Sequence, residues 1–503
     1  MTTIVSETGV ARYPRRVLVR PVEAARNRPR AAILSVLGLA TLVYLSGLGR
    51  SSLFIDEVFS WNASNHGLDG VNTAVHQAEV TPPLYYVLLH IWITVTGAGS
   101  EFMLRLPSAL AGIALVGAVM WFGRVVADIR AGLIAGILTA LSPLVLQYAQ
   151  EIRAYVFVML AVTIAAAATI KAVQEPDKRR WLTLAVGSTA LAVLLHYTAV
   201  LVLFPVFLWA VRQKELSVKG RLALGAAVAV PFVALIPLML VQVGAGHHNI
   251  AADAYAKITP VGLLKLAGTP WDGRALGGMS ITYELGFLVL VDALALLAFG
   301  DVFRRVRGRW LLVAASVLPI LLIVGVSALK HPMALTRYAA VAVPFMLVAI
   351  GVVISRLPQA MGVALMAVAV VASVIGIVAA QLPSGQWPDA RGAFADTAHR
   401  WRSGDVVVGL NNFAYPDSMD FYADRLPAGA GGAKGYYTSY DAFNAPQVKR
   451  ALKDCKRVFV VSSPPANPED VYGMAAQNRA RVIGERQWGG AYPVQVNTVS
   501  CNR

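Results

Sequence analysis

The sequence has little charge and lacks the common nucleotide-binding motifs. Only 14% of its 503 residues are Asp, Glu, Lys or Arg, against about 25% in soluble domains. So low a fraction of charged residues excludes a single, ordinary soluble globular domain. No P-loop, dinucleotide-binding fingerprint or internal repeat occurs in the chain, so the sequence does not indicate a process driven by ATP.

Apolar residues and positive charge are both in excess. Hydrophobic residues make up 57% of the chain, against about 45–50% in soluble domains, which favours a membrane protein with many spans. The formal net charge of +16 would indicate nucleic-acid binding in a soluble protein. Here the basic residues gather between apolar runs, which is typical of cytoplasmic loops, and we expect no nucleic-acid partner.

The first 30 residues are basic, and an apolar run follows them. The arginines of this segment are Arg12, Arg15, Arg16, Arg20, Arg26, Arg28 and Arg30. Residues 31–48 carry no charge and are long enough to form a transmembrane helix. A cleavable signal peptide is the alternative, but no small-residue cleavage site follows the run. We therefore expect an uncleaved first span and a cytoplasmic segment over residues 1–30.

Further apolar runs predict a transmembrane domain over residues 31–381. Besides 31–48, the expected spans are 106–122, 132–145, 155–172, 181–195, 198–211, 222–243, 283–299, 310–329, 338–355 and 359–380. Basic clusters within 171–180, 212–221 and 304–309 mark cytoplasmic loops. The short run 83–95 fits either a span or a helix in the outer interface, and we expect a total of about 11 to 13 spans.

The composition becomes mixed after residue 381, which predicts a separate soluble α/β domain over residues 382–503. Helices are expected at 389–401, 445–452 and 468–478, and strands at 405–410 and 457–462. Both cysteines, Cys455 and Cys501, lie here. A disulfide between them would fit an oxidising periplasm, and two free buried thiols are the alternative.

Short motifs place polar residues at the outer ends of the expected spans. Asp56 and Glu57 follow the first span. The later motifs are Pro82-Pro83-Leu84-Tyr85-Tyr86, Arg105-Leu106-Pro107-Ser108-Ala109, Gln150-Glu151-Ile152-Arg153-Ala154-Tyr155, His196-Tyr197 and Arg337-Tyr338. Ionised side chains beside apolar spans are costly unless they are paired or used, so these residues are candidates for a functional site.

In this order and spacing the motifs resemble those of the GT-C superfamily of membrane glycosyltransferases. The resemblance is to the bacterial relatives of protein O-mannosyltransferases and of the lipid A aminoarabinose transferase, and it covers roughly residues 31–380. It implies a polytopic α-helical membrane fold and transfer of a sugar from a polyprenyl-phosphate carrier to an acceptor at the outer face of the membrane. The soluble C-terminal domain is a variable addition in such enzymes.

The resemblance implies roles for the charged residues. Asp56 matches the first acid of the family motif and is our candidate general base for the acceptor hydroxyl. Glu57 is expected to bind the acceptor or to orient Asp56, with stabilisation of a helix end as the alternative. A leaving phosphate requires fixed cations, and Arg337 and Arg153 are the candidates.

The remaining candidates are expected to line the substrate site. They are Glu151, Tyr155, His196, Tyr197 and Tyr338, with Lys330 and His331 as helpers of the two arginines. Structural alternatives stay open, since Glu151 and Arg153 fit an ion pair in the cavity wall, His196 and Tyr197 fit a satisfied helix end, and the other tyrosines fit interfacial anchors.

No metal site is expected. His247 and His248 are adjacent, but no third ligand stands at a recognisable spacing. A divalent cation at Asp56 and Glu57 stays open, although nothing in the chain demands one. The resemblance implies no separate cofactor, because the polyprenyl-phosphate sugar is itself the donor substrate.

The predicted function is transfer of a monosaccharide from a polyprenyl-phosphate donor, with inversion at the anomeric carbon. We expect a bacterial cytoplasmic membrane protein whose site and C-terminal domain face the periplasm. Its partners are membrane lipids and an acceptor, which is a glycolipid, a polysaccharide or a protein. The sequence does not name the sugar. A transporter or lipid flippase is the alternative, but the polar groups gather at one membrane face, which favours catalysis.

Overall fold

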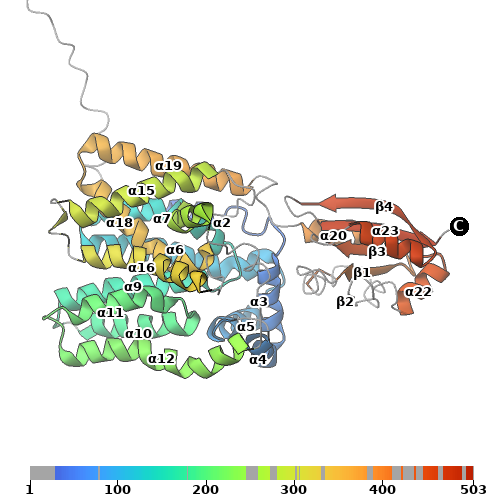
Figure 1. Cartoon of the computed structure of the whole chain (residues 1–503), viewed down its shortest axis with the longest axis horizontal. Coiled ribbons are helices and arrows are strands. Elements are labelled where there is room, and N and C mark those ends of the chain that lie inside the picture. Colours follow the sequence, from blue (N-terminus) through green and yellow to red (C-terminus); the bar gives the residue numbers. More distant parts are fainter. Residues whose placement is uncertain are drawn as a thin grey trace, which may run out of the picture.

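The computed structural model has a helical bundle joined to a smaller α/β region (Figure 1). It describes residues 29–77, 80–177, 179–244, 259–271, 280–300, 303–304, 306, 308–329, 335–381, 389–410, 421–422, 436–437, 446–462, 468–489 and 494–501. The α/β region lies beyond one end of the bundle, which we call the sheet-facing end (Figure 1).

Each expected span coincides with one or more helices of the bundle. These are α2 (Pro29–Leu45), α6 (Glu101–Val126), α7 (Ile129–Ala140), α9 (Tyr155–Gln174), α10 (Arg179–Leu195), α11 (Ala199–Val211), α12 (Val218–Gly244), α15 (Ser280–Phe299), α16 (Arg309–Ala328), α17 (Thr336–Ala339) with η3 (Ala340–Ala342) and α18 (Val343–Arg356), and α19 (Gln359–Gln381). Among the described residues, six helices are long and apolar enough to cross a membrane, or seven if α7 and α8 (Pro143–Ala149) form one bent span. The larger total expected from the sequence therefore stays a prediction.

Polar caps and small residues shape the bundle. Ser100 and Asp128 accept hydrogen bonds from amides in the first turns of α6 and α7, which satisfies groups that a helix start leaves unpaired. Gly132 lets α7 approach α6 closely, because a Cβ there would lie 2.3 Å from the backbone oxygen of Met120. The result is a tightly packed centre formed by α6, α7, α9 and α18.

Three short helices follow the first span and lie at the sheet-facing end (Figure 1). They are α3 (Ile55–Asn65), α4 (Gly67–Gln77) and α5 (Leu84–Thr96). The first two were not expected from the sequence, because neither has an apolar run long enough to span a membrane. With 13 residues, α5 is also shorter than the about 20 that a span needs, which favours the interfacial placement. Two further short elements, α14 (Pro260–Ala267) and η1 (Thr269–Trp271), precede α15.

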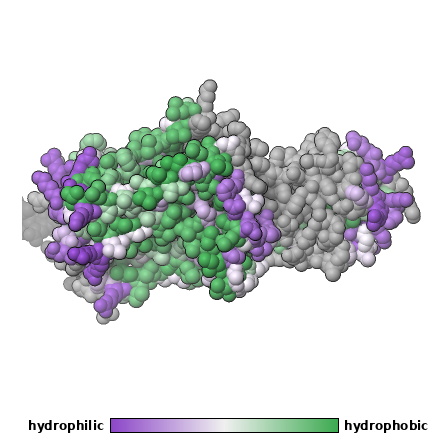
Figure 2. All heavy atoms as spheres, turned by 90° about the horizontal axis from the view of Figure 1, so that it is seen from below, coloured by the Kyte–Doolittle hydropathy of each residue, from purple (hydrophilic) through white to green (hydrophobic). Residues whose placement is uncertain are grey.

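The outside of the bundle is apolar. Figure 2 shows a broad hydrophobic band between hydrophilic surfaces at the two ends of the bundle. Large apolar side chains such as Leu42, Val230, Leu321 and Val371 are exposed on helices of the bundle. A soluble surface rarely carries so much contiguous apolar area, so the band supports placement of the bundle in a membrane.

The α/β region has a five-stranded mixed sheet in the order β2-β1-β3-β5-β4. Its strands are β1 (Val406–Leu410), β2 (Tyr436–Tyr437), β3 (Val458–Ser462), β4 (Ala480–Trp488) and β5 (Val494–Cys501), and its helices are α20 (Ala390–Arg400), α22 (Pro446–Lys453) and α23 (Pro468–Gln477). β1 pairs in parallel with β2 and β3, whereas β5 pairs antiparallel with β3 and β4. The three expected helices and two expected strands are confirmed to within a residue or two. β4 and β5 were missed, since polar residues interrupt both strands, among them Gln495 and Asn497 in β5, and neither forms a continuous apolar run like that of β3.

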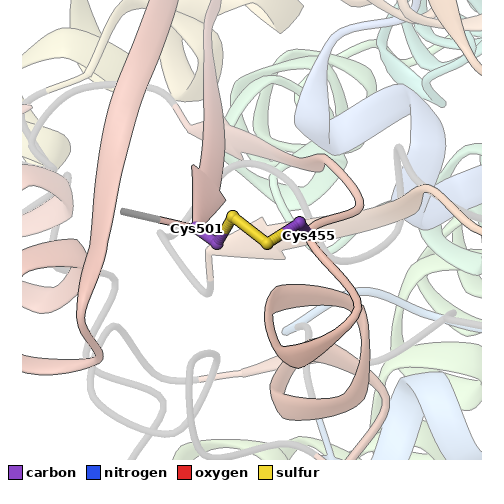
Figure 3. The surroundings of a disulfide bond; sticks show 2 residues. All are labelled: Cys455 and Cys501. Atoms are coloured by element: carbon purple, nitrogen blue, oxygen red, sulfur yellow. A yellow bond between two sulfur atoms is a disulfide. The ribbon is translucent and has the colours of Figure 1, made fainter. Parts of the chain in front are cut away.

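A disulfide joins Cys455 to Cys501 (Figure 3). It ties the turn after α22 to the end of β5 and closes a loop with a sequence separation of 46 residues. The disulfide expected from the sequence is therefore present, and the alternative of two free thiols is wrong.

Replacing Cys501 with Ser should lower the free energy of unfolding of the α/β region by about 2–4 kcal/mol, because the unfolded chain regains the freedom that a cross-link of this span removes. Thermal unfolding of the purified full-length protein, with and without reductant, measures the effect. Reductant should lower the midpoint of the wild type and leave Cys501→Ser unchanged. Equal midpoints for the two proteins without reductant would contradict the prediction.

Candidate active site

Asp56 lies in the first turn of α3, at the sheet-facing end of the bundle. The helix starts here because the Glu57 carboxylate accepts a hydrogen bond from the backbone N–H of Phe54 at 2.9 Å. The Asp56 side chain is 27% exposed, whereas Glu57 is fully buried. The two adjacent acids therefore occupy different environments, and of the two it is Asp56 that a substrate can reach.

Two arginines from distant parts of the chain meet at Asp56. Arg337 in α17 donates from Nη1 to Asp56 Oδ2 at 3.2 Å. Arg153, just before α9, has its Nη2 4.0 Å from the same oxygen and donates from Nη1 to the backbone carbonyl of Asp56 at 3.3 Å. The Arg337 side chain is 28% exposed and that of Arg153 is 9% exposed. One carboxylate and two cations thus gather at one accessible place.

Glu57 forms the buried support beneath this cluster. Its two carboxylate oxygens accept hydrogen bonds from Nε and Nη2 of Arg105, each at 2.7 Å, and one of them also accepts from the backbone N–H of Ile152 at 3.1 Å. Arg105 is itself 1% exposed. This arrangement favours a role in orienting Asp56 and fixing the helix start over the acceptor-binding role that the sequence suggested for Glu57.

Arg105 also binds the chain between α2 and α3. Its guanidinium donates to the backbone carbonyls of Leu48 at 3.1 Å, Ser51 at 2.8 Å and Ser52 at 2.9 Å. Arg105 belongs to the Arg105-Leu106-Pro107-Ser108-Ala109 motif, but it was not among the site residues predicted from the sequence. The signal was an arginine in an apolar helix, which needs several partners to be tolerated. Ser60, whose hydroxyl lies 3.4 Å from Arg153 Nη1, carried no signal in the sequence.

Glu151, Tyr155 and His196 form the wall beside Arg153. Glu151 is buried and accepts a hydrogen bond from Gln147 Nε2 at 3.0 Å. The Tyr155 ring lies 5.9 Å from the Arg153 guanidinium and 5.3 Å from the His196 ring. Burial and the nearby Arg153 cation lower the pKa of His196 to about 3, so its imidazole is uncharged at neutral pH and adds no positive charge to the cluster.

His196 and Tyr197 make contacts that fit a satisfied helix end. The backbone N–H of Thr198 donates to His196 Nδ1 at 3.2 Å. The Tyr197 hydroxyl donates to Gln242 Oε1 at 3.0 Å, and Gln242 in turn donates to the backbone carbonyls of Val75 and Thr81. Tyr197 therefore bonds to α12 at Gln242, and Gln242 in turn connects α12 to the segment around α4.

The other expected site residues are less close to the cluster or lie outside the described residues. Tyr338 is adjacent to Arg337 but packs with a small apolar cluster around Leu266 and Ile323, which leaves its substrate-binding role a prediction. Lys330, His331, His247 and His248 lie outside the described residues. Within the described part of the chain, no group of three or more His, Cys, Asp or Glu side chains could hold a metal ion.

One protein family matches part of the sequence. A family model described as dolichyl-phosphate-mannose-protein mannosyltransferase matches residues 80–240. The matched segment includes Glu151, Arg153, His196 and Tyr197, whereas Asp56 and Arg337 lie outside it. No curated protein matches the chain in sequence.

The fold resembles those of solved membrane transferases. ArnT from Cupriavidus metallidurans, in a crystal structure bound to undecaprenyl phosphate, is 14% identical, with 92% of this chain and 97% of that one covered at a TM-score of 0.57. The archaeal oligosaccharyltransferase AglB from Archaeoglobus fulgidus, in complex with an inhibitory peptide and a dolichol-phosphate, is 13% identical, with coverages of 89% and 71% at a TM-score of 0.50. The chain thus shares the fold of ArnT and AglB, and its residues 80–240 match the mannosyltransferase family model.

Proposed function

We propose that the protein transfers a monosaccharide from a polyprenyl-phosphate donor to an acceptor hydroxyl or amine, with Asp56 as the general base. The observation that carries the proposal is the meeting of Asp56 with Arg337 and Arg153. Glycosyl transfer needs a proton acceptor on the nucleophile's side and positive charge on the leaving group's side. Both are present within hydrogen-bond reach of each other, at the end of an apolar bundle.

The proposed step balances with these groups alone. The Asp56 carboxylate takes the proton of the acceptor, whose oxygen or nitrogen forms a bond to the anomeric carbon. The bond from that carbon to the phosphate oxygen breaks, and the electron pair leaves with polyprenyl phosphate. Arg337 and Arg153 stabilise the charge that develops on the phosphate. Attack opposite the leaving group inverts the anomeric carbon.

The fold and the position of the cluster support this class of donor. ArnT, which shares the fold, was solved with undecaprenyl phosphate, and a long lipid tail is compatible with a site bounded by apolar helices. Basic loops at the other ends of the spans favour a cytoplasmic location for those ends. We accordingly assign the Asp56 cluster and the α/β region to the periplasmic face of a bacterial cytoplasmic membrane. Acceptor candidates are a glycolipid, a polysaccharide and a protein.

Release of polyprenyl phosphate from purified protein is the decisive test. The protein is mixed in detergent or vesicles with polyprenyl-phosphate-linked sugars, one at a time, and with candidate acceptors. Mass spectrometry should detect polyprenyl phosphate together with a glycosylated acceptor for at least one pair. Movement of intact donor across vesicles without bond cleavage would overturn the proposal in favour of a flippase.

Replacing Arg337 with Ala should lower kcat/KM for the donor by about 100- to 1000-fold, the range seen when one charge-stabilising donor is removed. Arg337→Lys should recover part of the loss, because it restores the charge without the planar fork of donors. Steady-state kinetics with varied donor measures both.

Arg356→Ala is the matched control for Arg337. Arg356 ends α18, and its ion pair with Asp128 (3.3 Å) is exposed and lies away from Asp56. This variant should keep wild-type kinetics. Unchanged donor kinetics in Arg337→Ala would show that Arg337 does not stabilise the leaving phosphate.

A further inference from the structure

The short segment between α2 and α3 lacks regular structure where it approaches Asp56. Residues 51–54 belong to no helix or strand. Backbone groups in such a segment must find partners outside it. Some of these partners come from the α/β region, more than 330 residues later in the chain, and they form what we call the latch: Asp389, Arg391 and Tyr422.

Tyr422 holds the segment through its hydroxyl. The backbone N–H of Leu53 donates to the Tyr422 oxygen at 2.8 Å, and the same hydroxyl donates to Glu101 Oε1 at 3.2 Å. Tyr422 is completely buried. The hydroxyl therefore connects the α2–α3 segment, the first turn of α6 and the α/β region in one place.

Residues at the start of α20 also form hydrogen bonds with the same segment. Ser52 Oγ donates to Asp389 Oδ1 at 2.9 Å and accepts from the backbone N–H of Arg391 at 3.0 Å. The Arg391 guanidinium donates to the carbonyl of Gly49 at 3.0 Å. Asp389 also caps α20 by accepting from the N–H of Gly392. One carboxylate thus both begins the helix and binds Ser52.

From this segment the contacts lead directly to the proposed base. Arg105 binds the carbonyls of Ser51 and Ser52 on one side and the Glu57 carboxylate on the other. Glu57 is the neighbour of Asp56 and fixes the start of α3. One turn further along the same helix, Trp61 packs edge-on against Phe421, with ring centroids 5.0 Å apart. The α/β region therefore contacts α3 and the segment that precedes it.

We propose that the latch residues are positioning residues that hold Asp56 in register with Arg337 and Arg153, so that the α/β region takes part in catalysis without touching substrate. The inference rests on the proposed function. A domain attached to the bundle only through its covalent connection to α19 would need no hydrogen bonds to the backbone at Leu53 and Gly49. A displacement of about 1 Å at a reacting group is enough to cost about 100-fold in rate.

Tyr422→Phe tests the latch, since it removes one hydroxyl and keeps the ring. The expected result is a fall in kcat of about tenfold, with KM for donor and acceptor changed less than about twofold, because the loss of one buried hydrogen bond shifts the position of the base and not the binding of substrate. Arg486→Ala is the control. Arg486 is 56% exposed, and its ion pair with Asp396 (2.8 Å) lies in the same region but includes no residue of the α2–α3 segment, so its kcat should equal that of the wild type.

A second measurement separates positioning from loss of fold. Amide hydrogen exchange of peptides covering residues 49–60 should speed up in Tyr422→Phe, while peptides of β3 and β5 keep their wild-type protection. Ser52→Ala removes the bundle's hydrogen bonds to Asp389 and Arg391 and should lower kcat in the same way. If Tyr422→Phe and Ser52→Ala both retain wild-type kcat, the inference is overturned and the proposed function stands. If the wild type itself releases no polyprenyl phosphate with any donor, the proposed function fails and this inference falls with it.

Discussion

Asp56→Asn should reduce sugar transfer by at least about 1000-fold while the protein still inserts and folds. General-base catalysis contributes about 100- to 10,000-fold, and an amide of the same size cannot accept the proton. The ion pair of Asp56 with Arg337 is partly exposed and contributes little to stability, and the contact with Arg153 is long at 4.0 Å, so the variant should unfold close to the wild type. Single-turnover release of polyprenyl phosphate measures the rate.

The neighbouring helix offers a matched control for Asp56. Asp69 also lies in the first turn of a short helix, α4, at the same end of the bundle, and it is exposed. Asp69→Asn should keep wild-type activity, which shows that loss of an acid at this surface is harmless by itself. The Asp56→Asn variant should also retain bound donor, detectable by mass spectrometry after purification. Wild-type turnover in Asp56→Asn with authentic donor and acceptor would rule out Asp56 as the base.

The features predicted well from the sequence are those with a local signal. Apolar runs separated by basic clusters locate the helices of the bundle, because length and hydropathy alone decide whether a helix suits a membrane. The amphipathic helix α20 and the buried strand β3 were likewise readable from period and composition. The total number of spans was not settled this way, since several bundle helices are shorter than the bilayer is thick.

The features that the sequence did not give depend on contacts between distant residues. The sequence placed Asp56, Arg153 and Arg337 at one membrane face, but it could not show that their side chains meet at distances of 3.2–4.0 Å. It also could not assign Glu57, whose role depends on Arg105, a residue 48 positions later. The contacts of Tyr422 with Leu53 had no signal at all, because a tyrosine in a mixed segment is compatible with many environments.

Breaking the buried pair of Glu57 and Arg105 should have the largest effect on stability. Arg105→Ala should lower the free energy of unfolding by about 3–5 kcal/mol, since it leaves the Glu57 carboxylate buried with its main partner removed. It also frees the carbonyls of Ser51 and Ser52, so activity should fall with stability. Denaturant unfolding in mixed micelles, followed by tryptophan fluorescence, measures the first effect.

A double-mutant cycle distinguishes this pair from two independent buried residues. If Glu57 and Arg105 act as one unit, Glu57→Ala and Arg105→Ala should each cost several kcal/mol, and the double variant should cost clearly less than the sum, because removal of the second partner also removes an unpaired charge. The partly exposed pair Arg486–Asp396, treated in the same way, should give a coupling of at most about 1 kcal/mol. Additive losses would mean that each residue is held mainly by its backbone partners. For Glu57 these are the N–H groups of Phe54 and Ile152, and for Arg105 they are the carbonyls that precede α3. In that case Glu57 would not transmit the position of Arg105 to Asp56.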